Sequence, residues 1–325
     1  MKLRRIYFLL LPLLMLTMAA GLCFGSAPLS LSELAAAFSG PGTARTILLG
    51  IRLPRVLAGL LAGVGLSTAG VLLQTVTAND LASPNIIGIN SGAGLAVILL
   101  LTCAPKAGVW IPVGAFCGAF GAALVILAAG SRLGSSRSGI LLIGIAITTL
   151  LNAAISFLSL LDEGILAQYN HFTVGSLRAI RLGDLLIPGI IIALGFGASL
   201  ALSGRLSVLC LGDAAASALG VRVKPLRIAA MACAAACAAA VVSFAGLLGF
   251  VGLVVPHIAR TLAGERPVRL LPTAALAGGI LVILADLLGR TLFAPSELPV
   301  GILMSLIGAP YFLWLLIRRK RYAGS

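Results

Sequence analysis

Two ionisable side chains lie inside a long apolar run near the C-terminus, and they are the first candidates for chemistry. Asp286 and Arg290 are four residues apart within the run Leu270–Phe293. A charged side chain inside a membrane-spanning helix is costly and is a functional candidate by default. The i,i+4 spacing also places both side chains on one helix face, where they can pair. The spacing favours an ion pair or an interface contact, with a proton relay through Asp286 as the alternative.

Histidine and cysteine offer little for a metal centre. The chain has two histidines, His171 and His257, and six cysteines. None of the cysteines forms a Cys-x-x-Cys pair, and Cys233 and Cys237 have no histidine or carboxylate near them in the sequence. We interpret the cysteines as small apolar packing residues. No Ser/His/Asp set or carboxylate pair has a spacing that suggests catalysis, so the sequence predicts neither a metal site nor an enzyme.

A weakly charged segment between two apolar runs carries the pattern of a short helix. Residues 205–224 include the run Leu211-Gly212-Asp213-Ala214-Ala215-Ala216-Ser217-Ala218-Leu219-Gly220. We expect Asp213 to cap the start of this helix and Gly220 to end it. Two interpretations stay open at this point. The segment is either an ordinary loop helix that lies on a membrane or a docking element for a soluble partner.

The composition decides what kind of protein holds these residues. Of the 325 residues, 60% are hydrophobic and 10% are charged, against about 45–50% and about 25% in soluble globular chains. Because so little polar surface cannot cover a chain in water, the composition excludes a soluble enzyme, a nucleic-acid-binding domain and a disordered protein. The net charge of +14 does not indicate nucleic acid, since most basic residues fall in short gaps between apolar runs, as in membrane proteins.

The apolar runs predict an all-α polytopic membrane protein. A span needs about 20 apolar residues. The clear runs are Tyr7–Gly25, Val56–Thr77, Ile86–Cys103, Val109–Gly130, Gly139–Leu161, Leu185–Ser203, Leu270–Phe293 and Pro299–Ile317. A further run, Leu226–Gly264, is too long for one crossing, and its glycines and Pro256 divide it into two. The sequence therefore predicts about ten transmembrane helices.

Both ends of the chain are basic, which sets the predicted orientation. Lys and Arg accumulate on the cytoplasmic side of membrane proteins, so both termini are expected in the cytoplasm and the number of spans is even. With ten spans, 16 of the 23 basic residues fall on that side. The others are expected outside: Arg45, Arg52, Arg55, Lys106, Arg178, Arg181 and Arg290. The first run is longer than a signal-peptide core, so we expect a retained helix.

Close helix packing is predicted from small residues inside the spans. Gly59 and Gly63, and likewise Gly114 and Gly118, form GxxxG pairs. Such pairs let two helix backbones approach each other within a bilayer. The chain's 39 glycines are therefore read as the small residues of a tightly packed bundle.

Short motifs run in a fixed order from about Arg52 to Arg318. They are Ile51–Arg55 (IRLPR), Gln74, Asn79–Pro84 (NDLASP), Gly175–Leu177 (GSL), Leu211–Gly220, Gly249–Arg260 (GFVGLVVPHIAR), Asp286 with Arg290, Glu297–Gly301 (ELPVG) and Gly308–Pro310 (GAP). Together they resemble the FecCD-type permease subunits of bacterial ABC importers for iron–siderophore complexes, haem and cobalamin. Two positions depart from that pattern: Asp80 stands where the family usually has proline, and Phe172 where it usually has tryptophan.

The resemblance implies an assembly. It implies the type II ABC importer permease fold, with residues 1–325 forming a single permease domain in the bacterial cytoplasmic membrane and a homodimer with a pathway at its axis. Two ATP-binding subunits and an extracytoplasmic substrate-binding protein are the implied partners, besides membrane lipid, and nucleic acid is not one. The chain has no Walker motif, so ATP and magnesium are expected on the ATPase and no cofactor or metal on this chain.

The resemblance also assigns roles to individual residues. Arg52 and Arg290 match outer-face arginines that hold carboxylates of the binding protein. Arg137 and Ser138 fall near the cytoplasmic gate. The residues that match the ATPase coupling helix are Leu211, Gly212, Asp213, Ala215, Ala218, Leu219 and Gly220.

The implied cargo is an iron(III)–siderophore chelate, with haem or cobalamin as alternatives. Two functions of other classes remain as rivals. One is an ion-coupled secondary transporter that uses Asp286 as its coupling site, since such transporters place their ion sites within the membrane. The other is a membrane enzyme, but the sequence contains no convergent set of catalytic residues that would support it.

Overall fold

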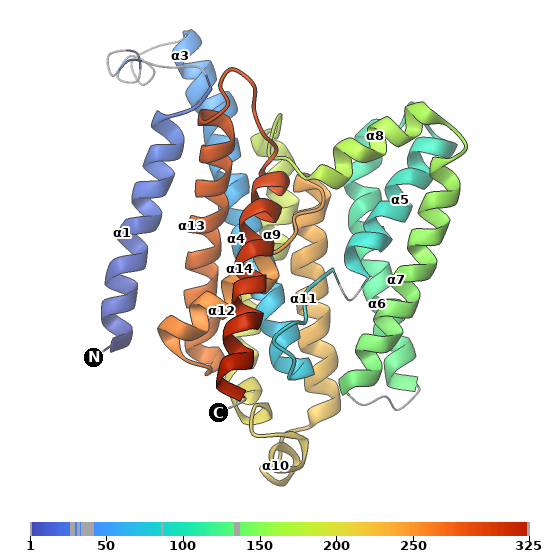
Figure 1. Ribbon diagram of the computed structural model, residues 1–325, viewed down its shortest axis with the longest axis vertical. Coiled ribbons are helices and arrows are strands. Elements are labelled where there is room, and N and C mark those ends of the chain that lie inside the picture. Colours follow the sequence, from blue (N-terminus) through green and yellow to red (C-terminus); the bar gives the residue numbers. More distant parts are fainter. Residues whose placement is uncertain are drawn as a thin grey trace.

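The computed structural model describes residues 2–26, 30, 33, 42–85, 88–132 and 137–323, and these residues form helices and connecting loops without a strand (Figure 1). The helices are α1 (Lys2–Cys23), α3 (Thr43–Arg45), the π-helical segment η1 (Thr46–Arg52), α4 (Leu53–Thr77), α5 (Ile89–Cys103), η2 (Gly108–Trp110), α6 (Ile111–Arg132), α7 (Arg137–Ser159), α8 (Glu163–Val174), η3 (Leu182–Leu185), α9 (Leu186–Leu209), α10 (Asp213–Ala218), α11 (Val223–Ala245), α12 (Val251–Ala263), α13 (Pro267–Thr291) and α14 (Val300–Ala323).

Seven of the described helical stretches are long and apolar enough to cross a membrane. Three shorter apolar helices accompany them: Ile89–Cys103, Val251–Ala263 and Val300–Leu315. These ten helices occupy the ten apolar runs that the sequence predicts, so the protein is an all-α, multi-pass membrane protein. The count of ten spans stays a prediction, because the three shorter helices fall below the usual length of a crossing.

The bundle has two distinct ends. Both chain termini and α10 lie at one of them, here called the α10 end, whereas α3 and α8 lie at the other, the α8 end (Figure 1). α1 stands at one edge beside α13, while α5, α6 and α7 form a group at the opposite edge. The termini and the short helix of residues 213–218 therefore share one end, as the predicted orientation requires.

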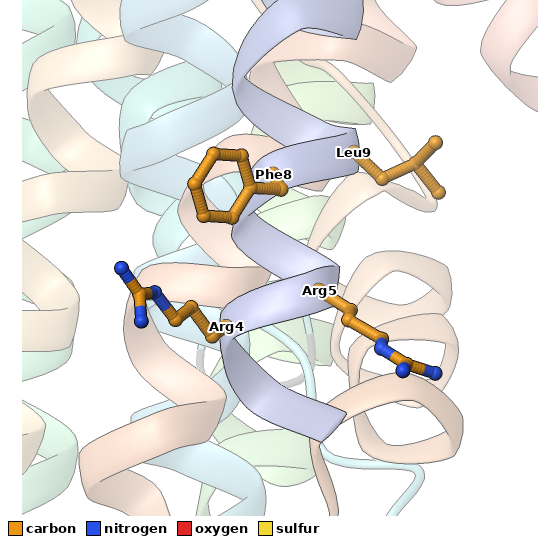
Figure 2. Close-up of a pocket in the computed structure, with 4 residues that line it drawn as sticks. All are labelled: Arg4, Arg5, Phe8 and Leu9. Atoms are coloured by element: carbon orange, nitrogen blue, oxygen red, sulfur yellow. The ribbon is translucent and has the colours of Figure 1, made fainter. Parts of the chain in front are cut away.

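The buried centre of the bundle is built from α4, α11 and α13. Of the apolar window of α4, 78% is buried, against 11% for α7, so the peripheral helices turn most of their side chains outward. The first helix, α1, shows this clearly at its start, where Phe8 and Leu9 are 70% and 67% exposed. Figure 2 shows them with Arg4 and Arg5 around a cavity of about 440 Å³ on the outside of α1.

Small residues allow the central helices to approach each other, as the GxxxG pairs predict. A Cβ atom on Gly63 of α4 would overlap the carbonyl of Gly278 on α13, and one on Gly278 would overlap the carbonyl of Gly63. Gly118 of α6 and Gly92 of α5 stand in the same relation. Since lipid supplies no hydrophobic drive between helices, this backbone proximity is a main source of packing energy.

The long run Leu226–Gly264 divides where its glycines predict. α11 ends at Ala245, Gly246 follows with a φ of 69°, and α12 begins only at Val251. α12 is 13 residues long and keeps Pro256 inside it. The prediction of two helices, the second of them short, is confirmed.

We expect Gly63→Val to destabilise the bundle, because two extra methyl groups and a Cβ would meet the backbone of α13. Overpacking costs about 1–3 kcal/mol or more when the neighbour is rigid. Thermal unfolding of the detergent-purified protein should show a clear loss in Tm, accompanied by aggregation. Gly197→Val on α9 is the matched control, since a Cβ there meets nothing within 4 Å. Equal Tm values for the two variants would contradict this packing.

Candidate functional site

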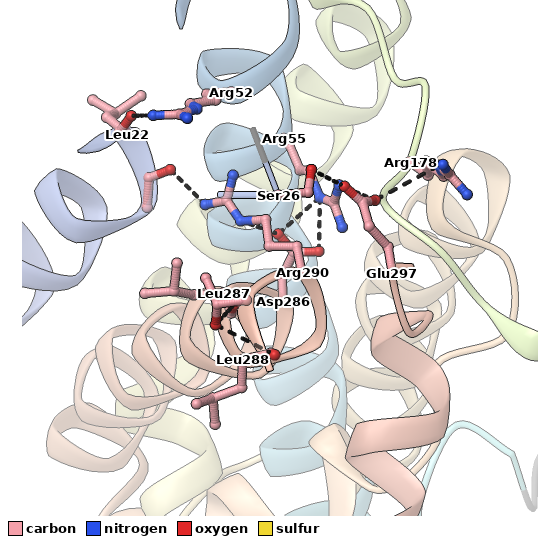
Figure 3. A network of polar contacts seen from close by, with 12 residues as sticks. Leu22, Ser26, Arg52, Arg55, Arg178, Asp286, Leu287, Leu288, Arg290 and Glu297 are labelled. Atoms are coloured by element: carbon pink, nitrogen blue, oxygen red, sulfur yellow. Dashed lines mark hydrogen bonds and ion pairs between the residues drawn. The ribbon is translucent and has the colours of Figure 1, made fainter. Parts of the chain in front are cut away.

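Charged side chains gather at the α8 end of the bundle although almost everything around them is apolar. Arg52 ends η1, Arg55 lies in the first turn of α4, Asp286 and Arg290 lie on α13, and Glu297 lies in the loop before α14. These five residues are called the charged cluster below. Figure 3 shows the side chains of Arg55, Asp286, Arg290 and Glu297 together, with Arg52 directed beside them toward Leu22. All but Glu297 are at most 6% exposed.

Arg55 is the central cation of the charged cluster. Its Nε lies 2.9 Å from each carboxylate oxygen of Asp286, and its Nη1 lies 2.8 Å from Oε2 of Glu297. Burying an ion without a partner costs several kcal/mol, so the two carboxylates require Arg55 and Arg55 requires them. One guanidinium thereby joins α4 to α13 and to the loop that precedes α14.

Asp286 and Arg290 pair as their i,i+4 spacing predicts. The Nε of Arg290 lies 3.6 Å from Oδ2 of Asp286. The closer partner of Asp286 is nevertheless Arg55, which the sequence did not single out for this role. Asp286 is thus an anion shared by two arginines, and this arrangement favours the ion-pair interpretation over a proton relay.

Arg52 and Arg290 both donate to the end of α1. Nη1 of Arg52 donates to the carbonyls of Leu22 at 2.8 Å and Cys23 at 2.6 Å, and Nη2 of Arg290 donates to the carbonyl of Gly21. The last carbonyls of a helix have no partner within it, and positive charge is favourable there. The two arginines therefore cap α1, and each is only 3% exposed. Their docking role stays a prediction, and a partner's carboxylate would have to compete with these carbonyls.

Glu297 forms the outward edge of the charged cluster. The hydroxyl of Ser26 donates to its Oε1 at 2.7 Å, and Nε of Arg178 lies 3.6 Å from its Oε2. Burial opposes ionisation of Glu297, but the hydrogen bonds from Ser26 and Arg55 outweigh it, so the pKa of this carboxyl is lowered. From the sequence, Arg55 was expected in the IRLPR motif and on the outer side, and Glu297 in the ELPVG motif, but neither had an assigned partner. Their shared signal was a charge directly beside an apolar run, which does not say which partner it meets.

The predicted coupling residues lie at the opposite, α10 end. α10 is a six-residue helix that begins at Asp213 and has Gly212 (φ 104°) as its N-cap. The prediction that Asp213 caps this helix is wrong, because Asp213 is its first residue and pairs instead with Nη2 of Arg227 at 2.8 Å. The helix starts one residue earlier than expected because the glycine adopts a conformation that favours glycine.

Gly220 ends α10 as predicted. Its φ is 79°, the N–H of Val221 donates to the carbonyl of Ala216 at 3.0 Å, and the N–H of Gly220 donates to Ser217 at 3.0 Å. This pair of hydrogen bonds is a Schellman motif, which usually requires glycine at this position.

The surface of α10 consists of small side chains and is flanked by two leucines. Ala216 is fully buried against the bundle, while Ala215 and Ala218 are exposed. Leu211 and Leu219 are 67% and 64% exposed. The segment thus presents apolar surface outward, which an ordinary water-facing loop would not do.

The departure at Asp80 gives the loop after α4 a contact that proline could not make. Oδ1 of Asp80 lies 3.5 Å from Nη1 of Arg260 on α12. The turn itself is held by Asn79, whose Oδ1 accepts a hydrogen bond from the N–H of Leu81 at 2.9 Å.

The predicted gate residues Arg137 and Ser138 begin α7, and their side chains lie outside the described residues. Among the described residues no group of three His, Cys, Asp or Glu side chains suits a metal.

We expect Glu297→Gln to lower the Tm at pH 7 by about 2–4 °C, as for a loss of about 1 kcal/mol. Because the pKa of Glu297 is lowered in the folded protein, its contribution is present above its unfolded value of about 4.3 and disappears as the pH falls through the folded value. The difference in Tm between the two proteins should therefore begin to shrink as the pH falls below about 4.3 and should disappear once the pH is below the folded-state pKa. Glu265→Gln, at an exposed position after α12, is the control. A gap that persisted at acid pH would contradict the role of the charge.

Comparison with known proteins places this geometry in a family. The model described as the FecCD transport family matches residues 13–318. The chain is 39% identical over 281 residues to the hemin transport system permease protein HmuU of Yersinia pestis, covering 84% of each chain. It is 37% identical over 294 residues to the iron(3+)-hydroxamate import system permease protein FhuG of Bacillus subtilis, covering 86% of this chain and 87% of that one.

The solved structures agree with this result. The chain is similar to an inward-facing metal-chelate type ABC transporter, with a TM-score of 0.85, 31% identity and coverage of 97% of this chain and 99% of that one. PsaBC from Streptococcus pneumoniae, at 15% identity and a TM-score of 0.59, shares the fold. With the family model matching nearly the whole length, the chain belongs to the FecCD transport family of ABC importer permeases.

Proposed function

We propose that this permease moves an iron(III)–siderophore-type chelate from an extracytoplasmic binding protein across the bacterial cytoplasmic membrane, as a homodimer with two ATP-binding subunits. Its class is that of transport permeases, in which a separate subunit hydrolyses ATP. Relatives named for iron(3+)-citrate and iron(3+)-hydroxamate import support the iron chelate as cargo. Relatives named for hemin and cobalamin make those the alternatives.

The observation that best supports a role of α10 in coupling to the ATPase is its exposed face of small side chains. A helix that must seat in a cleft of another protein needs a surface without large or charged side chains, and Ala215 and Ala218 provide it. Leu211 and Leu219 offer apolar contact on either side. Asp213, paired with Arg227 at 2.8 Å, fastens the segment to α11, so that a displacement of α10 would be transmitted into the bundle.

The proposed orientation follows from the position of this segment. If α10 meets the ATPase, the α10 end is cytoplasmic, both termini are cytoplasmic, and the number of spans is even, in agreement with the proposed ten. The charged cluster then lies at the extracytoplasmic end, where Arg52 and Arg290 would meet the binding protein. Arg137 and Ser138 would then begin α7 at the cytoplasmic gate.

The rival of an ion-coupled transporter has less support in the geometry. A coupling carboxylate has to exchange its ion or proton during transport. Asp286 is engaged by Arg55 and Arg290 and is 3% exposed. This carboxylate is built into the packing of α4 against α13. The rival of a membrane enzyme likewise finds no catalytic set among the described residues.

A proteoliposome assay tests both the cargo and the coupling role. The complete importer, loaded with ATP, should take up an iron(III)–hydroxamate chelate faster than hemin or cobalamin. Ala215→Arg should reduce uptake at least tenfold because its side chain cannot fit a cleft shaped for alanine, while the permease still inserts. Leu160→Arg is the matched control, since Leu160 is 86% exposed at the α8 end. Normal uptake and ATPase co-purification by the Ala215→Arg importer would refute the coupling role, and a hemin or cobalamin preference would refute the cargo.

Charge reversal tests the docking role. Arg52→Glu with Arg290→Glu should slow association with the binding protein about tenfold at low salt, and less at high salt. Because both arginines cap α1, the comparison needs Arg52→Gln with Arg290→Gln, whose amides still donate to the carbonyls. Carboxylate-to-Lys changes on the binding protein should restore docking to the Glu variant. If the arginines served only to hold α1, the Lys changes on the binding protein would not restore docking. A failure to restore docking would therefore contradict the prediction.

A further inference from the structure

A groove of about 610 Å³ opens at the α8 end, on a part of the bundle that neither proposed docking surface uses. Three long helices supply much of its apolar wall: Val113 and Phe116 come from α6, Ile187 and Ile191 from α9, and Phe244 from the end of α11. The exposed side chains among these are apolar, with Val113 50% and Ile187 69% exposed. The groove is therefore a concave apolar surface that the described chain leaves uncovered.

One cation and one anion stand at the rim of this groove. Arg178, whose side chain is 69% exposed, contributes the cation. Its contact with Glu297 is long, at 3.6 Å, and uses only Nε of a guanidinium that has five N–H donors, so the exposed guanidinium has capacity for another anion. Asp184 contributes the carboxylate, which the N–H of Arg181 holds in place through a 3.0 Å hydrogen bond to Oδ2.

The groove lies where two candidate spans begin. α6 starts at Ile111 and α9 at Leu186, and both belong to stretches apolar enough to cross a membrane. Val109, 88% exposed, lines the groove, and the next residue, Trp110, is 61% exposed. Exposed tryptophan is typical of the level where lipid head groups meet acyl chains. The charged rim of the groove therefore suits the head group of a lipid, and its apolar walls suit an acyl chain.

We propose that this groove is a binding site for a phospholipid with an amino head group, of the phosphatidylethanolamine type. The acyl chain lies along Val113, Phe116 and Ile187, the phosphate meets the guanidinium of Arg178, and the ammonium meets the carboxylate of Asp184. The volume falls in the range of about 300–1,000 Å³ that is usual for small-molecule sites. A primary ammonium can donate hydrogen bonds to Asp184, whereas a choline head group cannot. The site does not depend on which cargo the permease carries.

Native mass spectrometry of the delipidated full-length protein, titrated with defined lipids, tests the proposal. Phosphatidylethanolamine should bind about fivefold more tightly than phosphatidylcholine or phosphatidylglycerol. Arg178→Gln should weaken phosphatidylethanolamine binding about fivefold, the effect of about one cation near a phosphate. Asp184→Asn should abolish the preference over phosphatidylcholine, and its amide oxygen still accepts the N–H of Arg181, so the local fold is retained.

Two matched controls separate this site from general contact with the bilayer. Ile187→Trp fills the groove, whereas Leu194→Trp places the same side chain on α9 outside it, and both positions are 69% exposed. Arg181→Gln removes a neighbouring exposed arginine that does not line the groove. Within these two pairs, Ile187→Trp and Arg178→Gln should reduce binding of phosphatidylethanolamine, whereas Leu194→Trp and Arg181→Gln should leave it unchanged.

The opposite results would overturn the proposal. Equal lipid binding by Ile187→Trp and Leu194→Trp, or by Arg178→Gln and Arg181→Gln, would show non-selective contact with surrounding lipid. If Ile187→Trp instead changed the oligomeric state and left phosphatidylethanolamine binding unchanged, the groove would be a contact between copies of the chain. Each of these results can be distinguished from a failure of the transport assay, because none requires cargo or ATP.

Discussion

The requirement that buried charge be neutralised governs the α8 end of this permease. Arg55 meets it by placing one guanidinium between Asp286 and Glu297, at 2.9 and 2.8 Å. The planar guanidinium suits this task better than an ammonium, because its fixed fork can address two carboxylates at once. Removal of Arg55 would leave two anions without their main partner, so the geometry of α4, α13 and the loop before α14 depends on it.

The same constraint determines where α1 lies. α1 turns most of its leucines outward and packs mainly on α13, so apolar packing alone holds it weakly within a bilayer. Arg52 and Arg290 add directional bonds to its last carbonyls. The two guanidinium groups thus meet the negative, C-terminal end of the α1 dipole, and the helix carbonyls and the arginines both have hydrogen-bond partners away from water. Any partner that engages these arginines acts on a site that is already occupied by the protein itself.

The two ends of the bundle are built on different principles. The α8 end is fastened by charge, whereas the α10 end presents an alanine surface between two glycines with positive φ. Between them, the backbones of α4 and α13 touch at Gly63 and Gly278, which leaves little room for one helix to move without the other. A bundle of this kind suits rigid-body movement, in which displacement at one end reaches the other through stiff helices.

The sequence by itself determined the class, the ten long apolar helices and the family, but not α8 or the helical stretch Thr43–Arg52 before α4. Composition and run length require a membrane bundle whatever its packing, the glycines locate the break after Ala245 and the end of α10, and the ordered motifs identify the relatives. Only the tertiary structure decided the partners of the charges. The i,i+4 spacing predicted the pair of Asp286 with Arg290, but the nearer contact comes from Arg55, 231 residues away. Local spacing describes one helix face, whereas partners across helices depend on how the whole bundle packs.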